Sequence, residues 1–141
     1  MKKFLTLGIA LLALSCTHRE KLNSAEGDTH HASTEITLNN GQKWTVNPEM
    51  KPYVSNGRDL VNTFVDGNQT DYAALAEKLQ EQNQLLIKSC TMKGESHDEL
   101  HKWLHPHLEM TEALADADAS SAREIVLQLQ HSYELYDEYF N

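Results

Sequence analysis

Apolar residues recur at intervals of three and four in four successive segments after Asn47, and this spacing constrains the fold more than any other feature. Such a spacing places the apolar side chains on one face of an α-helix. The first segment begins at Asn47-Pro48, a capping residue followed by a proline suited to a first turn, and ends at Asp66-Gly67. Four amphipathic helices with short connections fold most simply as an up-down-up-down bundle. The sequence therefore predicts an all-α four-helix bundle over residues 47–141.

The other three helices have recognisable ends. The second begins at Thr70 or Asp71 and ends before Gly94, and the third begins near Ser96. The fourth begins at Ser121, because Ser121 and Glu124 have the spacing of a capping box. The residues expected to face the core are Met50, Val54, Gly57, Leu60, Val61, Phe64, Tyr72, Leu75, Leu79, Leu86, Cys90, Leu100, Trp103, Leu104, Leu108, Leu114, Ile125, Leu129, Tyr133, Tyr136 and Phe140.

Residues 34–46 follow a different pattern. Two short β-prone stretches, Ile36–Leu38 and Trp44–Val46, flank Asn39-Asn40-Gly41. An Asn-Gly pair between such stretches is typical of a tight hairpin turn. Since two strands alone are marginally stable, we expect a small hairpin or extended segment whose Trp44 packs on the bundle.

The N-terminus carries an export pattern. Lys2 and Lys3 precede the apolar run Phe4–Leu14, and small residues then lead to Cys16. This arrangement resembles a bacterial lipoprotein signal. The resemblance implies that residues 1–15 are removed, that Cys16 is lipidated, and that residues 16–33 tether the domain to a membrane. A plain secretory signal cut near the same place is the alternative. Either reading predicts a cell-envelope protein, and lipidation would place it on the periplasmic or outer-membrane face.

Charge and cysteine content exclude two kinds of protein. The full chain has 21 acidic and 12 basic residues, and loss of Lys2 and Lys3 with the signal leaves 10 basic residues and a net charge near −11. A chain this acidic does not suit nucleic acid, whose phosphates require a basic face. If Cys16 is lipidated, Cys90 is the only remaining thiol, so an intrachain disulfide cannot form.

Metal-ligand residue types are concentrated between residues 90 and 107. They are Cys90, Met92, His97, His101, His105 and His107. His97 and His101 lie one helical turn apart, so both imidazoles can reach one ion. Met92 or Cys90 in the preceding loop is expected to supply a third ligand. A thioether or thiolate beside two imidazoles suits copper or zinc.

The same segment resembles the signature of a family of small exported lipoproteins from the Bacteroidota. That signature pairs a Thr-Met-Lys-Gly-Glu-x-His loop, here 91–97, with a Leu-His-x-aromatic-Leu-x-Pro helix, here 100–106. The likeness covers residues 43–140 and includes Lys43-Trp44, Asn47 and Met50. It implies export, and the family brings no assigned function.

The helix lengths and order over residues 47–140 are also similar to those of the soluble four-helix-bundle cytochromes b. Those proteins hold haem between a methionine in the first turn of helix 1 and a histidine near the end of helix 4. Met50 matches the first ligand, but Tyr136-Asp137 occupies the second position and the nearest histidine, His131, lies earlier. The resemblance therefore supports the bundle, and we do not expect haem.

These patterns lead to one functional hypothesis and two alternatives. The chain is expected to be a membrane-tethered periplasmic binding protein for copper or zinc, with a metal-transport or other envelope protein as a partner. The alternatives are a ligand-free structural or interaction module and, less favoured, a haem-binding bundle. No activated nucleophile and no pair of carboxylates with distinct roles is recognisable, so an enzyme is not expected.

Overall fold

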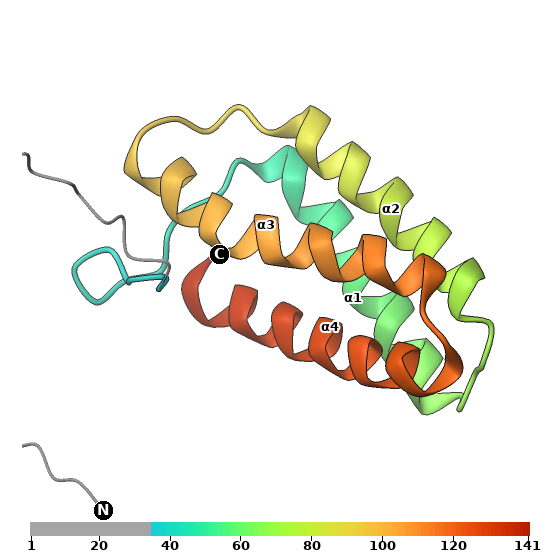
Figure 1. Ribbon diagram of the computed structural model, residues 1–141. Helices are drawn as coiled ribbons and strands as arrows, with labels where there is room; N and C mark the ends of the chain where they lie inside the picture. The colour runs from blue at the N-terminus through green and yellow to red at the C-terminus, as the bar shows by residue number, and fades with distance from the viewer. Residues whose placement is uncertain (1–34) are drawn as a thin grey trace, which may run out of the picture. The chain divides into compact units, whose positions relative to one another are not determined.

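A computed structural model describes residues 35–141 as a bundle of four helices (Figure 1). The elements are the short 3₁₀ turn η1 (Pro48–Met50) and the helices α1 (Lys51–Asp66), α2 (Tyr72–Ser89), α3 (Glu95–Asp116) and α4 (Ala119–Tyr139). Successive helices pack against each other, and α1 also packs against α4, which closes the bundle. The predicted all-α four-helix bundle is confirmed.

Predictions for the N-terminus lie outside the described residues. They concern the signal peptide 1–15, the lipidated Cys16 and the tether 16–33. In the part of the chain that the structure does describe, each helix is too short or too polar to cross a membrane.

Side-chain caps begin α2 and α4. The Asp71 carboxylate accepts a hydrogen bond from the Ala74 N–H at 3.1 Å, so the predicted start of the second helix is confirmed. The predicted Ser121 capping box is wrong. The Asp118 carboxylate accepts from the Ser120 and Ser121 amides at 2.9 and 3.0 Å. Because Asp118 pairs these amides first, α4 begins at Ala119 and Ser121 already lies within its first turn.

The core follows most of the expected positions. Most residues of the predicted stripes are buried, and Met50, Leu79 and Leu129 are fully so. Five of the expected residues are only partly buried: Leu60, Tyr72, Cys90, Leu108 and Ile125. Polar residues occupy core positions that the apolar pattern did not include: Asn83, Glu99, His107, Thr111 and Ser132.

The Asn-Gly turn forms, but the predicted hairpin strands do not. Asn40 and Gly41 have φ angles of 52° and 83°, as a tight two-residue hairpin turn requires. Asn39 and Gln42 exchange backbone hydrogen bonds of 2.8 and 3.0 Å across it. No strand follows this pair within residues 35–141, so the segment is a turn between extended stretches.

The stretch after the turn pairs with the C-terminus instead. The Trp44 N–H donates to the Tyr139 carbonyl at 2.8 Å, and the Asn141 N–H donates to the Trp44 carbonyl at 3.0 Å. The Val46 N–H then donates to the Asn141 carbonyl at 3.1 Å. These bonds form a parallel bridge between Trp44 and Phe140. Trp44 is 6% exposed, which confirms the prediction that it packs on the bundle.

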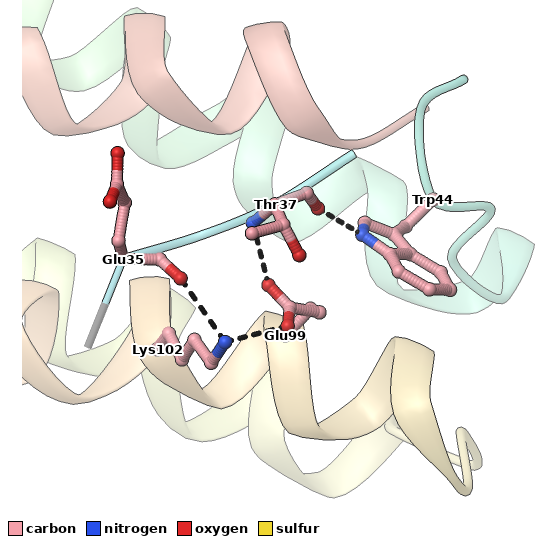
Figure 2. A network of polar contacts seen from close by, with 5 residues as sticks. All are labelled: Glu35, Thr37, Trp44, Glu99 and Lys102. Carbon is pink, nitrogen blue, oxygen red and sulfur yellow. Dashed lines mark hydrogen bonds and ion pairs between the residues drawn. The ribbon is translucent and has the colours of Figure 1, made fainter. Parts of the chain in front are cut away.

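The residues before the turn form a strap, Glu35–Thr37, that is fastened to α3. Figure 2 shows Glu99 and Lys102 directed from α3 toward its backbone. Glu99 accepts from the Thr37 N–H at 2.8 Å and from Lys102 Nζ at 2.6 Å. Lys102 Nζ also donates to the Glu35 carbonyl at 3.1 Å, while the Trp44 indole N–H donates to the Thr37 carbonyl at 2.6 Å. The strap is therefore held from both sides.

The Glu99 carboxylate is ionised in this network. Burial alone would raise its pKa, but hydrogen bonds and charge from Lys102, together with the Thr37 N–H, keep the pKa below its usual value. Charge-assisted hydrogen bonds of this kind are among the stronger polar interactions in proteins.

We expect Glu99→Gln to loosen the strap and lower the free energy of unfolding by about 1–3 kcal/mol, because it leaves the Lys102 ammonium without its counter-charge. Urea unfolding and hydrogen exchange at the Thr37 amide measure the two effects. Glu95→Gln, at an exposed position of α3, is the control. An unchanged Thr37 exchange rate in Glu99→Gln would show that the network does not hold the strap.

Gly57 allows α1 and α4 to approach closely. A methyl group at this position would overlap the Tyr133 hydroxyl. Although alanine is the better helix former, we expect Gly57→Ala to destabilise the protein by about 1–3 kcal/mol, since the clash outweighs the helix propensity. Adding Tyr133→Phe should restore part of this loss in thermal unfolding. A double variant less stable than both single variants would contradict this explanation.

Candidate metal site

Three imidazoles form a histidine row along one edge of α3, consisting of His97, His101 and His105. The Nε2 atoms of His97 and His101 lie 3.0 Å apart. The Nδ1 atom of His101 lies 3.1 Å from Nε2 of His105. Since the residues are four apart in sequence, their side chains follow one another along the helix. The structure thus brings together the two histidines predicted as ligands.

Exposure rises along the row toward His105. His97 and His101 are half-buried and His105 is exposed. Partial burial lowers the pKa of His101, and repulsion from His97 and His105 lowers it further, while the Asp98 carboxylate acts in the opposite sense.

The histidine row is one wall of a hollow between α2 and α3. This α2–α3 hollow has a volume of about 270 Å³. It is lined by Met50, Leu86, Ile87, Cys90, Leu100, Leu104, Leu108 and the three histidines of the row. Cys90, a predicted ligand, therefore shares a hollow with His97 and His101. Met92, the other predicted ligand, packs on the hydrophobic core and is not part of this lining.

The Asn47 side chain fixes the backbone on both sides of Cys90. Its Nδ2 donates to the Ser89 carbonyl at 2.9 Å, and its Oδ1 accepts from the Thr91 N–H at 3.1 Å. The backbone carbonyl of Asn47 accepts from the Met50 N–H at 3.0 Å. One residue therefore ties the segment that carries Met50 to the segment that carries Cys90. No local sequence signal indicated this long-range contact.

The candidate site is not a complete set of metal ligands as its side chains stand. Among residues 35–141, no three His, Cys, Asp or Glu side chains are close enough together to hold a metal ion as they stand. The close group is the His97–His101 pair, and Cys90, at the end of α2, lines the same hollow. A third ligand must move toward this pair if an ion is to be bound by three groups.

His107 is separate from the histidine row and belongs to the core. It is fully buried, stacks on Trp103, and its Nδ1 lies 3.0 Å from the Ser132 hydroxyl. Burial lowers its pKa to about 4, so it is neutral near pH 7. Within the described part of the chain its Nε2 atom has no hydrogen-bond partner, nor has the Tyr136 hydroxyl.

Met50 and His131, the two residues compared with the haem ligands of the cytochromes b, differ in their exposure to solvent. Met50 is fully buried at the start of the bundle. His131 is on the outside of α4, where its Nδ1 lies 3.2 Å from the Glu134 carboxylate and 77% of its side chain is exposed. His131 does not fit the role of a haem ligand inside the bundle.

Comparison of the chain with protein-family models, with curated proteins and with solved structures finds no match. The resemblances described from the sequence therefore remain predictions.

We expect stability to fall on acidification because of His107. Its pKa in the folded protein, about 4, is below the value of about 6.5 for an exposed histidine. The unfolded chain thus binds more protons between these values, and the free energy of unfolding should drop by about 2 kcal/mol from pH 7 to pH 5. Urea unfolding across this range measures the slope.

The control for this prediction is His107→Gln, which keeps a polar side chain without a titrating group. Its unfolding free energy should depend much less on pH between 7 and 5. Equal slopes in both proteins would assign the pH dependence to other groups. Glu99 contributes only at lower pH, since its pKa is below the usual carboxyl value.

Proposed function

We propose that the protein is an exported binding protein for a soft or borderline transition-metal ion, copper or zinc, held at the His97–His101 pair. The observation that carries this proposal is the 3.0 Å separation of the two Nε2 atoms at the edge of the α2–α3 hollow. Two imidazole nitrogens that converge in this way can both bind one ion with a small change of side-chain angle. Cys90, which lines the same hollow, is the third ligand we assign, and its side chain would move toward the pair when an ion binds.

The other nitrogen of His101 has a hydrogen-bond partner, and that of His97 lies near a carboxylate at a distance longer than a hydrogen bond. Metal-binding histidines usually donate their second N–H to a nearby acceptor, which fixes the ring and its tautomer. Nδ1 of His101 lies 3.1 Å from Nε2 of His105, and Nδ1 of His97 lies 3.9 Å from the Asp98 carboxylate. His105 and Asp98 are therefore positioned to orient the ligands rather than to bind the ion.

The contacts also describe what an ion would replace. With neutral rings, one Nε2–H of the His97–His101 pair donates to the other nitrogen. An ion bound at both Nε2 atoms requires each neutral ring to carry its single N–H proton on Nδ1, so the ring that held the Nε2–H releases that proton to solvent and takes one up on Nδ1. Nδ1 faces Asp98 in His97 and His105 in His101.

The place of action follows from the N-terminal pattern. We propose that Cys16 carries the lipid and that the helical domain stands on the envelope side of a membrane, where it buffers metal or passes it to a transport protein. The proposal rests on the apolar run Phe4–Leu14 before Cys16 and on the acidic balance of the chain.

One observation favours a second candidate function, a protein-interaction module without a metal. An apolar α3–α4 groove of about 430 Å³ lies on another side of α3 and includes Trp103, Pro106, Leu127 and Leu135. Leu127 is 52% exposed, which is unusual for a large apolar residue. Absence of metal binding would favour this candidate.

We expect the reduced full chain carrying Cys16→Ser to bind one Cu(I) or Zn(II) ion in titrations against competing chelators. His97→Ala/His101→Ala should reduce the affinity by more than the ~10–100-fold that loss of an orienting partner causes. His105→Ala should show only that smaller loss. His131→Ala, which removes an exposed histidine of α4, is the matched control and should leave the affinity unchanged. Equal affinities in all four proteins would refute the proposed site.

A further inference from the structure

The α2–α3 hollow is lined by two sulfur side chains that come from outside α3, Met50 of η1 and Cys90 at the end of α2. Met50 and Cys90 line it together with Leu86, while the histidine row lines the α3 edge. We propose that this hollow is selective for Cu(I) over Zn(II), with the Met50 thioether and the Cys90 thiolate as ligands together with His97 and His101. This inference rests on the proposed metal-binding function.

The ligand types support Cu(I). A thioether is a soft, neutral donor that binds Cu(I) well and contributes little to a Zn(II) site. Met50 is therefore the residue that separates the two ions, since imidazole and thiolate bind both. Met50 lines the α2–α3 hollow and is 0% exposed to solvent.

Charge balance in the α2–α3 hollow also favours a monovalent ion. When Cys90 binds Cu(I), the S–H bond breaks, a sulfur–copper bond forms and the proton leaves to the buffer. One positive charge replaces another, and the site stays neutral. With Zn(II) the same four ligands would retain one positive charge among the apolar side chains of Leu86, Leu100 and Leu104. Burying an uncompensated charge is costly.

The backbone that carries the two sulfur side chains is held before any ion arrives, and the Cys90 side chain must still move toward the histidines. The Asn47 side chain donates to the Ser89 carbonyl and accepts from the Thr91 N–H, which holds the backbone around Cys90, and the Asn47 carbonyl accepts from the Met50 N–H. Asn47 is thus a positioning residue for both sulfur ligands. Preorganised ligands lose less conformational entropy on binding, which strengthens affinity.

The test compares Met50→Leu with Met92→Leu in the full chain with Cys16→Ser. Both changes replace a thioether by a similar apolar side chain, but only Met50 lines the α2–α3 hollow. Under reducing conditions we expect Met50→Leu to lower Cu(I) affinity by about tenfold or more and to leave Zn(II) affinity unchanged. Met92→Leu should change neither. Unchanged Cu(I) affinity in Met50→Leu, or an equal loss in Met92→Leu, would overturn the assignment.

X-ray absorption at the copper edge gives a second measurement that does not depend on the stability of a variant. The copper-loaded chain should show two sulfur scatterers together with imidazole nitrogen, and one or none would overturn the inference. The outcomes separate the two proposals. Metal binding that needs His97 and His101 but shows no effect of Met50 leaves the metal site standing without copper selectivity. Binding that ignores both histidines rejects both.

Discussion

Burial of one face of α3 in the core determines which side chains lie on the other faces of that helix. Leu100, Trp103 and Leu104 are 1%, 2% and 6% exposed, so the rotation of α3 about its axis is fixed by the core. Each residue along an α-helix turns by about 100°, which leaves two other faces at set angles. One carries the histidine row beside α2, and the other carries Glu99 and Lys102 beneath the strap. A single packing interaction thereby positions both the candidate site and the fastening of the N-terminal segment.

The sequence was sufficient to predict the four helices, because the signals that mark a helix are local. Apolar spacing and residues such as Asp71 act within one or two turns, so they identify a helix before its neighbours are known. The error at Ser121 has the same origin. Ser121 and Glu124 have the correct spacing, but the Ser121 amide, which a capping box would pair with Glu124, donates to Asp118 instead. Two local signals competed, and the sequence alone offered no measure of which was stronger.

Residues 35–46 could not be predicted in the same way, because their partners are distant in sequence. The Asn-Gly turn is local and was correctly expected, whereas Trp44 pairs with Tyr139 and Asn141 at the other end of the chain. Glu99 is also instructive. A carboxylate beside Leu100 is normally placed on the solvent side of a helix, yet it is 6% exposed because Thr37 and Lys102 hydrogen-bond to it. Such burial depends on a partner that periodicity does not reveal.

The candidate site was only partly predictable, because some of its contacts are local and others depend on residues distant in sequence. The proximity of His97 and His101 follows from helical geometry, and the structure agrees with it. The choice between Cys90 and Met92 depends on the path of the loop 90–94, which no repeat or spacing specifies. Asn47 determines that path by hydrogen-bonding on either side of Cys90. Met50 appeared from its spacing to be only a core residue, and it is buried as expected.

The position of Met50 shows why core packing and metal binding need not compete in this fold. Its backbone and the apolar part of its side chain complete the end of the bundle, while the same residue lines the α2–α3 hollow. Replacement by leucine preserves the apolar volume and removes only the sulfur. Folding therefore constrains the size of the side chain at this position, whereas the metal binding proposed for the hollow requires that the side chain contain sulfur. The two requirements act on different properties of one side chain, so an experiment can vary one and hold the other constant.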